Sequence, residues 1–197
     1  MTAFMSNDGE SLSLGDIDLL VGEIERLRTH ASKLESRIQE LDRLVYRDTL
    51  VDVLNRRGLI ASLQNLIARV DRYGDQAALL FIDVDGLKLI NDRFGHTAGD
   101  SALAEVARTI VACVRNSDSV GRLGGDEFAV LLERADELSA WQMGLRIVEA
   151  VVGSKFCVNG ACLPLSVAVG VGVIKTGDVP QTVIERADKA MYKIKAA

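Results

Sequence analysis

The sequence predicts an α+β protein with a ferredoxin-like βαββαβ core, which carries extra helices and a small hairpin and is preceded by one long helix. Three observations predict this class. Residues 16–47 repeat apolar side chains at heptad spacing. Beyond residue 48, apolar runs of strand length alternate with amphipathic runs of helix length. Two of the strands are joined by a Gly-Gly-Asp turn, which is typical of a tight hairpin.

The composition fits one globular domain with an arm. The chain has 197 residues, of which 48% are hydrophobic and 26% charged, close to the usual values for globular domains. Its net charge of −5 argues against a protein that holds nucleic acid on a diffuse basic surface. We therefore expect no nucleic-acid partner and a real hydrophobic core.

Targeting signals and cysteines point to the cytoplasm. The N-terminus lacks the basic start and apolar run of a signal peptide, and no apolar stretch reaches the ~20 residues that span a bilayer. The three cysteines, Cys113, Cys157 and Cys162, are odd in number and contain no CxxC pair. We expect no membrane contact, no disulfide framework and no zinc site, with two of the cysteines buried in apolar runs.

The arm is expected to be a flexible tail followed by a coiled coil. Residues 1–15 are polar and rich in Gly and Ser. In residues 16–47, apolar side chains recur alternately three and four residues apart, which favours a parallel two-stranded coiled coil and hence a homodimer. An amphipathic helix folded back on its own domain is the alternative. The a positions hold Ile17, Ile24, Ala31, Ile38 and Val45, and the d positions hold Leu20, Leu27, Leu34 and Leu41.

The body, residues 48–197, divides by the period of its apolar residues. Without the short hairpin around Asn159-Gly160, the core order is β-α-β-β-α-β, in which two crossovers bring the end of strand 77–84 close to the Gly-Gly-Asp turn. In chain order we expect a helix over 55–71, a strand over 77–84, a helix over 98–115, strands over 118–123 and 127–133, a helix over 137–152, the short hairpin, a strand over 164–174 and a helix over 180–195.

Two acidic segments lie at those two places. Asp83-Val84-Asp85 ends the apolar strand, and residues 124–127, Gly-Gly-Asp-Glu, form the tip of the hairpin. Four carboxylates on neighbouring loops would repel one another, and oxygen ligands of this kind suit Mg²⁺, which also binds the phosphate oxygens of nucleotides. The two glycines would let the backbone approach a phosphate closely. An acidic turn that faces solvent is the alternative for either segment taken alone.

Taken together, residues 48–195 resemble the GGDEF domain, the diguanylate cyclase family. Residues 124–128 read Gly-Gly-Asp-Glu-Phe, the family signature. Residues 83–100 match the family pattern D-x-D-x-x-K-x-x-N-D-x-x-G-H-x-x-G-D. The resemblance implies a core of the nucleotide cyclase and polymerase-palm type. It also implies a catalytic domain over residues 48–197 that condenses two GTP into cyclic di-GMP and two pyrophosphates, in bacterial second-messenger signalling.

The resemblance implies a metal site and catalytic groups. Two Mg²⁺ ions per half-site, or Mn²⁺ in their place, would be bound by Asp83, the Val84 carbonyl and Asp126. Asp126 or Glu127 would help to remove the proton of the attacking 3′-hydroxyl; family precedent favours Asp126, although a metal-bound carboxylate is a poor base. Lys88 would stabilise negative charge in the transition state.

The resemblance also implies a GTP site. Asn91 and Asp100 would read guanine, because a carboxylate can accept from its N1–H and 2-amino group, whereas adenine offers no such pair of donors. His96 would either contact the ligand or fix the loop. Lys195 would hold the terminal phosphates. The implied substrate-binding residues are Asn91, His96, Asp100, Gly124, Gly125 and Lys195.

The family's reaction needs two domains that face each other, because each site holds one GTP. The coiled coil would supply effective concentration and orientation, so a change of register before Asp48 should alter turnover. The joint after Asp48 departs from the family pattern, since Val51 and Asp52 stand where the family has Thr and Gly.

A second site resembles the family's product-inhibition motif. Arg115 and Asp118 form an R-x-x-D sequence that ends five residues before the signature. Arg115 would hold the guanine and phosphate of cyclic di-GMP, Asp118 would accept from guanine, and Arg146 could complete the site. A surface ion pair at a helix end is the alternative.

Other functions are consistent with parts of this pattern. A non-catalytic receptor for GTP or cyclic di-GMP would usually carry a broken signature, and the signature here is intact. A coiled-coil signalling scaffold would need neither both acidic loops nor the guanine pair. A cyclase that uses mixed purines is disfavoured by Asp100.

Overall fold

The computed structural model describes residues 14–158 and 160–196, and for residues 14–19 and 39–44 it describes the backbone only. The chain divides into two compact units, residues 1–43 and residues 44–197. Most of the predicted tail lies outside the described residues, as does Asn159 of the predicted hairpin turn.

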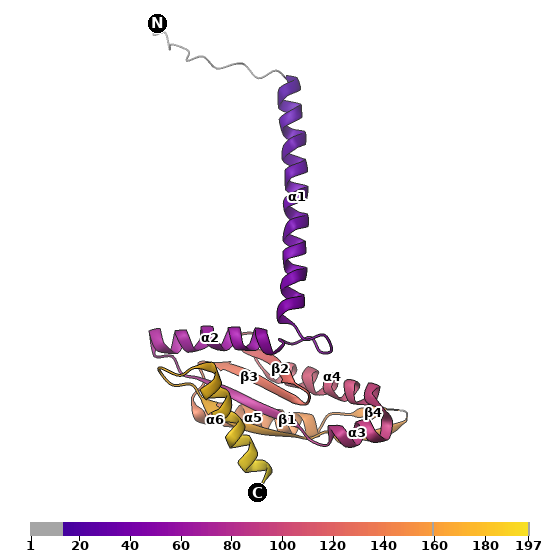
Figure 1. The fold of residues 1–197 in the computed structure, drawn as a ribbon, viewed down its shortest axis with the longest axis vertical. Helices are drawn as coiled ribbons and strands as arrows, with labels where there is room; N and C mark the ends of the chain where they lie inside the picture. The colour runs from indigo at the N-terminus through magenta and orange to yellow at the C-terminus, as the bar shows by residue number, and fades with distance from the viewer. Residues whose placement is uncertain (1–13, 159, 197) are drawn as a thin grey trace. The chain divides into compact units, whose positions relative to one another are not determined.

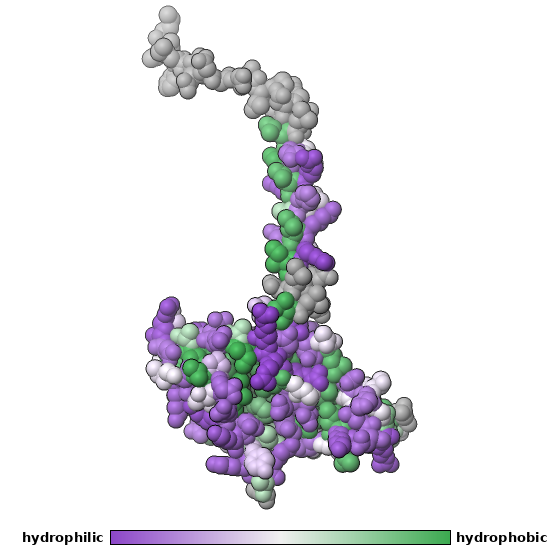
Figure 2. Space-filling view, in the orientation of Figure 1, coloured by the Kyte–Doolittle hydropathy of each residue, from purple (hydrophilic) through white to green (hydrophobic). Residues whose placement is uncertain are grey.

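The long N-terminal helix, α1 (Leu14–Tyr46), ends within two residues of the predicted range 16–47. Figure 2 shows its apolar side chains gathered along one stripe. The described a and d leucines and isoleucines are 48–63% exposed: Leu20, Ile24, Leu27, Leu34 and Ile38. Removing such side chains from water lowers the free energy, so this stripe is suited to packing against another helix.

The body contains a four-stranded antiparallel sheet in the order β2-β3-β1-β6. This is the predicted ferredoxin-like order, with the hairpin β4–β5 inserted after α5 (Figure 1). None of the described helices has the length and hydropathy of a membrane span. The elements are α2 (Arg56–Tyr73), β1 (Ala77–Val84), α3 (Leu87–Phe94), α4 (His96–Cys113), β2 (Ser119–Gly124), β3 (Glu127–Glu133), α5 (Glu137–Val152), β4 (Phe156–Val158), β5 (Ala161–Leu163), β6 (Val167–Val173) and α6 (Pro180–Lys195).

The ends of the predicted elements agree with the structure to within three residues, but helix α3 is an addition to them. It contains eight residues between Gly86 and Gly95, which have φ of 68° and 85°. A helix this short repeats its apolar face too few times for the helical period to be recognised in the sequence.

The two faces of the sheet bury separate apolar clusters, because successive strand residues point to opposite faces. On β1, Leu80 and Ile82 pack in the cluster formed with α4 and α5. Leu79 and Phe81 pack in the cluster formed with α2 and α6. The same alternation places Asp83 on the α2–α6 side, at the carboxyl end of β1.

Helix α6 lies close to the sheet because two glycines of β6 face it. A Cβ on Gly170 would stand 2.2 Å from both the Ala187 carbonyl oxygen and the Met191 nitrogen. A Cβ on Gly172 would stand 2.9 Å from the Val183 carbonyl oxygen. Only glycine permits this approach of helix backbone to strand.

The joint between α1 and α2 is held by its own polar groups. Oδ1 of Asp48 accepts from the backbone nitrogens of Leu50 and Val51 at 2.9 and 3.0 Å. The Asn55 side chain caps α2 and donates to the Val45 carbonyl oxygen at 2.9 Å. Val51 is 4% exposed and belongs to the core, which explains an apolar residue at this position.

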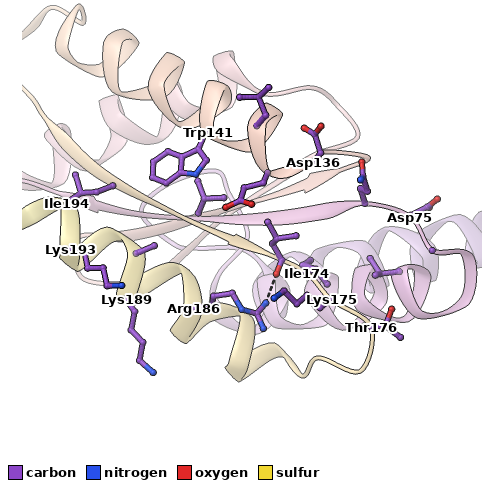
Figure 3. Close-up of a pocket in the computed structure, with 18 residues that line it drawn as sticks. Asp75, Asp136, Trp141, Ile174, Lys175, Thr176, Arg186, Lys189, Lys193 and Ile194 are labelled. Carbon is purple, nitrogen blue, oxygen red and sulfur yellow. Dashed lines mark hydrogen bonds between the residues drawn. The ribbon is translucent and has the colours of Figure 1, made fainter.

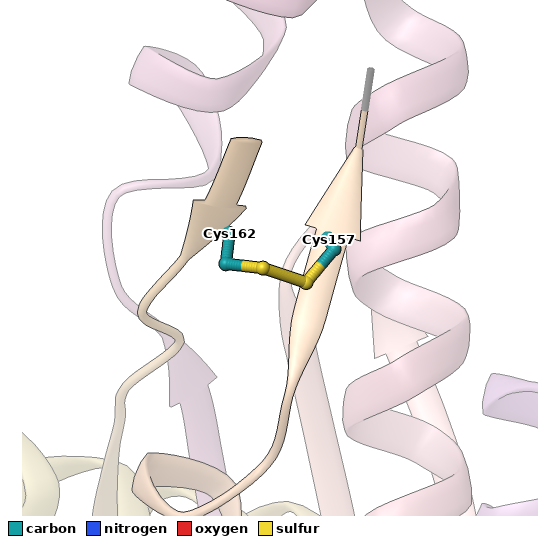
Figure 4. The surroundings of a disulfide bond; sticks show 2 residues. All are labelled: Cys157 and Cys162. Carbon is teal, nitrogen blue, oxygen red and sulfur yellow. A yellow bond between two sulfur atoms is a disulfide. The ribbon is translucent and has the colours of Figure 1, made fainter. Parts of the chain in front are cut away.

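Cys157 and Cys162 form a disulfide across the β4–β5 hairpin (Figure 4). The two residues are direct partners in the register of the strands, and both are exposed. The predictions of no disulfide and of two buried cysteines are therefore wrong. Strand register, which depends on the hairpin as a whole, brings the sulfur atoms together. Cys113 is half-buried and free.

Candidate functional site

Four carboxylates gather where β1 and the β2–β3 hairpin end; we call Asp83, Asp85, Asp126 and Glu127 the acidic edge. Asp83 lies directly opposite Glu127 in the antiparallel pairing of β1 with β3. The Val84 nitrogen donates to the Asp126 carbonyl oxygen at 3.0 Å, which holds the hairpin tip against the end of β1. The two acidic segments of the sequence therefore meet in space.

Lys195, at the end of α6, places a positive charge on the acidic edge. Its Nζ pairs with Oδ1 of Asp83 and, at 3.2 Å, with Oδ1 of Asp85. Burial works to lower the pKa of Lys195, but the hydrogen bonds to the two carboxylates outweigh it, and the pKa is raised above its ordinary value. A cation from a distant part of the chain thus already binds these carboxylates.

The pKa of Glu127 is raised above its ordinary value. Burial is the main cause, and repulsion by Asp126, Asp83 and Asp188 adds to it, while Arg56 acts in the opposite direction. Glu127 therefore holds a proton more readily than an ordinary glutamate, which suits a general base or acid.

The tip of the hairpin is an open backbone turn. Gly124 and Gly125 have φ of 153° and 52°, which other residues rarely adopt, and a Cβ on either would meet nothing within 4 Å. Arg122 donates to the Gly125 carbonyl oxygen from Nε at 3.0 Å and from Nη2 at 2.7 Å. Its Nη1 lies 3.4 Å from Oδ1 of Asp48, so one arginine connects the tip to the joint after α1.

Asp85 is held by the segment that follows the β4–β5 hairpin. Its nitrogen donates to the Ser166 carbonyl oxygen at 2.9 Å, and the Ser166 hydroxyl donates to its Oδ2 at 3.0 Å. These two bonds fix the loop that leads from β1 into α3.

The donor set of the acidic edge fits a magnesium ion bound together with a nucleotide. Within the described residues, no three His, Cys, Asp or Glu side chains are grouped closely enough to hold a metal by themselves. The predicted set contains two carboxylates, Asp83 and Asp126, and the Val84 carbonyl. Mg²⁺ commonly binds one or two carboxylates and completes its shell with water and phosphate oxygens. The ammonium of Lys195 on Asp83 and Asp85 shows that a cation fits at this edge.

The α3–α4 pair brings two of the predicted guanine-reading residues into one region. A Cβ on Gly99 would stand 2.0 Å from Oδ1 of Asn91, so the Asn91 amide lies against the first turn of α4, directly before Asp100. Asp100 is exposed, as are His96 and Lys88. In the part of the chain that the structure describes, neither His96 nor Lys88 forms an ion pair with the acidic edge.

The R-x-x-D residues form a closed turn between α4 and β2. Asp118 accepts from the Arg115 nitrogen at 3.0 Å and from the Glu133 nitrogen at 3.3 Å. Arg146, on α5, donates to the carbonyl oxygen of Cys113, two residues before Arg115. The structure therefore places Arg115 and Asp118 in one turn and brings Arg146 to the end of the preceding helix, with both oxygens of Asp118 engaged in holding the turn.

A groove of about 1170 Å³ lies between α5, α6 and the end of β6 (Figure 3). Trp141, Lys175, Lys189 and Lys193 line it, together with Arg186, which is held in an ion pair at 2.8 Å. None of the predicted site residues lines this groove. The acidic edge, where the carboxylates gather, therefore lies outside this groove.

Two residues that support the acidic edge are missed by reasoning from the sequence. Arg122 had a usable signal in the sequence, because it is a charged residue inside an apolar strand. In the structure its side chain is 15% exposed. Ser166 had none, since its partner Asp85 lies 81 residues away in the sequence.

The fold and the acidic edge define a class: a ferredoxin-like α+β domain with carboxylates gathered at the end of its central strands. Comparison with known proteins narrows this class. The family model described as diguanylate cyclase, GGDEF domain, matches residues 45–197. The response regulator PleD of Caulobacter vibrioides is 35% identical over 178 residues, which cover 89% of this chain and 39% of PleD.

Solved structures agree with the family match. The GGDEF domain of TpbB from Pseudomonas aeruginosa superposes with a TM-score of 0.72 at 35% identity, over 77% of this chain and 89% of that one. The coiled coil and GGDEF domain of DgcB from Caulobacter crescentus, solved with c-di-GMP, gives a TM-score of 0.82 over 90% and 94% of the two chains. At 24% identity it shows the fold alone.

The chain therefore belongs to the GGDEF family. It spans 39% of PleD and 27% of DgcP from Pseudomonas aeruginosa, so it corresponds to less than half of these curated relatives.

Proposed function

We propose that this chain is a diguanylate cyclase that joins two GTP into cyclic di-GMP and two pyrophosphates across a homodimer. The observation that carries the proposal is the acidic edge: an intact GGDEF signature whose Glu127 stands opposite Asp83, with Asp126 bonded to the end of β1. GTP is a nucleotide of the cytoplasm, so we infer that the protein works there.

We assign the catalytic roles from the GGDEF family resemblance, and the geometry of the acidic edge supports them for the residues at that edge. Asp83, the Val84 carbonyl and Asp126 would bind two Mg²⁺ ions, or Mn²⁺ in their place. When bound, the metal neutralises charge on the reacting α-phosphate. Glu127 or Asp126 takes the proton of the 3′-hydroxyl. The raised pKa of Glu127 supports Glu127, because a base is most effective when its pKa lies closer to the working pH. Lys88 stabilises negative charge in the transition state.

Substrate recognition is assigned to the α3–α4 pair and the hairpin tip. Asn91 and Asp100 read the guanine edge, and His96 lies at the start of the same helix. The open glycine turn at residues 124–125 approaches the phosphates. Lys195 holds the terminal phosphates, which requires its ammonium to leave Asp83 and Asp85 when GTP binds.

The homodimer is assigned to α1. Its heptad leucines and isoleucines are about half exposed in the single chain, which supports their burial against a second copy in a parallel coiled coil. Two tethered domains have a high effective concentration for each other, commonly about millimolar for a short linker. The coil thereby makes the meeting of two GTP-loaded sites intramolecular.

The first experiment is incubation of the purified chain with GTP and Mg²⁺ and separation of the nucleotides by chromatography. Cyclic di-GMP is expected from the unmodified chain and not from Asp126→Ala. If the unmodified chain binds GTP or cyclic di-GMP in a titration but makes no product, the receptor function replaces the cyclase.

Product inhibition is assigned to the turn that holds Arg115, Asp118 and Arg146. Arg115 is exposed, and Arg146 contacts the chain two residues before it, which supports binding of a phosphate and a guanine there. Arg115→Ala should therefore keep the reaction running as cyclic di-GMP accumulates, whereas exposed Arg93→Ala, the matched control, should stall as the unmodified chain does. Stalling of both variants would exclude this site.

A further inference from the structure

The β4–β5 hairpin carries a disulfide that the proposed cyclase reaction does not use. Cys157 and Cys162 are direct partners across the two strands, and both residues are exposed (Figure 4). A thiolate from solution can therefore reach the sulfur atoms, and such access is what thiol–disulfide exchange requires.

The disulfide contributes little as a structural staple. Its cysteines are only five positions apart, and a short closed loop removes less chain entropy from the unfolded state than a long one. The base of the hairpin is already anchored in the core, because Phe156 is 6% exposed and Leu165 is 1% exposed. The hairpin therefore has hydrophobic contacts that remain when the sulfur atoms separate.

We propose that Cys157 and Cys162 form a thiol–disulfide exchange site that reacts with small thiols and their disulfides. In the oxidising direction, one cysteine thiolate attacks a small disulfide such as oxidised glutathione and releases one glutathione. The second cysteine then displaces the other glutathione and closes the protein disulfide. The protein gives up two electrons and two protons, which leave with the two glutathiones; reduction is the reverse. In a reducing cytoplasm the pair stays open until small disulfides accumulate.

The hairpin is connected to the acidic edge by three residues of chain. Strand β5 ends at Leu163, and Ser166 makes both bonds that hold Asp85. We therefore extend the proposal: closing the disulfide limits the local motion of β5 and so protects the bonds of Ser166 to Asp85, whereas opening it permits more of that motion while Phe156 and Leu165 stay in the core.

The exchange is tested on the full chain with Cys113→Ser, by alkylation and intact mass. This variant should hold two alkylatable thiols after dithiothreitol. After treatment with oxidised glutathione it should have no alkylatable thiol. Its mass should be lower than that of the reduced chain by two hydrogens, with no glutathione attached. Cys157→Ser and Cys162→Ser in the same background are matched controls, in which the remaining cysteine should carry one glutathione. Peptide mapping of the unsubstituted chain gives the same result without relying on the variants.

Three results would overturn the exchange site: thiols that stay free in oxidised glutathione, two added glutathiones, or a disulfide that resists dithiothreitol in the folded protein. None of these measurements depends on GTP turnover, so they stand apart from the cyclase proposal.

The connection to the acidic edge is tested by hydrogen exchange of the oxidised and reduced chain. The Asp85 amide, which is bonded to Ser166, should lose protection on reduction. The Val84 amide, which is bonded to Asp126, should keep its protection. A Cys157→Ala, Cys162→Ala double variant should behave as the reduced form under both conditions. Equal protection of Asp85 in the two forms would overturn the extension.

Discussion

The surroundings of the Glu127 carboxylate disfavour its charged form. Glu127 stands opposite Asp83 on the next strand, it is partly buried, and Asp126 and Asp188 add to the repulsion. Its pKa is therefore higher in the folded protein than in the unfolded chain. For an acid this sign means that the folded state loses stability as the pH rises above the ordinary pKa of 4.5.

Replacing this charge should stabilise the fold. Glu127→Gln is expected to raise the free energy of unfolding at pH 7 by about 0.2–1 kcal/mol, the range for a pair directly opposite on neighbouring strands. Well below pH 4.5 the gain should vanish, because both states then hold the proton. Urea unfolding at the two pH values measures this, with exposed Glu149→Gln as the control. An equal gain in the free energy of unfolding at the two pH values would show that packing, and not charge, causes it.

Arg122 makes its contacts in a nearly enclosed place. It holds the Gly125 carbonyl and lies beside Asp48, with both charged side chains below 20% exposure, at 15% and 17%. Arg122→Ala should lower the free energy of unfolding by about 1–3 kcal/mol, because the remaining polar groups lose a partner away from water. Arg108, whose ion pair leaves it 73% exposed, is the control, and its alanine variant should lose less than about 1 kcal/mol. Comparable losses in denaturant unfolding would contradict this account.

At the scale of elements, the contact of α6 with β6 positions Lys195. The glycines of β6 let the helix backbone lie on the strand, and the end of that helix then reaches Asp83. The position of a charged group at the acidic edge therefore depends on residues that carry no side chain.

A methyl group in this contact should be costly. Gly170→Ala would place Cβ within 2.2 Å of helix backbone atoms, which cannot rotate away as a side chain can. We expect a loss of about 3 kcal/mol in thermal or urea unfolding, the upper part of the usual range for overpacking. Gly22→Ala is the control, since a Cβ there meets nothing within 4 Å, and it should cause no loss. Wild-type stability of Gly170→Ala would refute the close approach.

At the scale of the whole molecule, the phase of the heptad repeat should control how two domains meet. Four residues inserted between Arg43 and Leu44, at the boundary of the two units, shift the coiled-coil register, whereas seven residues restore it. We expect the four-residue insertion to lower cyclic di-GMP production severalfold and the seven-residue insertion to leave it nearly unchanged. Sedimentation should show dimers in both. Equal production by all three chains would remove any role for orientation.

The sequence allowed the elements with strong patterns to be predicted. Strand 77–84 is continuously apolar and helix 180–195 begins with a proline, and both have the predicted bounds. The meeting of Asp83 with Glu127 followed from the order of the strands. The ion pair of Lys195 with Asp83 could not be predicted, because it depends on how closely α6 packs on the sheet, and no local period reports that distance. The disulfide had a usable signal, since a two-residue turn at residues 159–160 places Cys157 opposite Cys162.

Strand β2 is the outer strand on one side of the sheet, and an open outer strand invites pairing with other chains and aggregation. Leu54 occupies part of this border: its nitrogen donates to the Val120 carbonyl oxygen at 3.0 Å, and its carbonyl oxygen accepts from the Arg122 nitrogen at 2.7 Å. The segment that follows the long helix thus also covers part of the β2 edge and hinders its pairing with strands of other chains. We expect a chain shortened to begin at Arg56 to expose this edge and to aggregate more readily than one that begins at the joint.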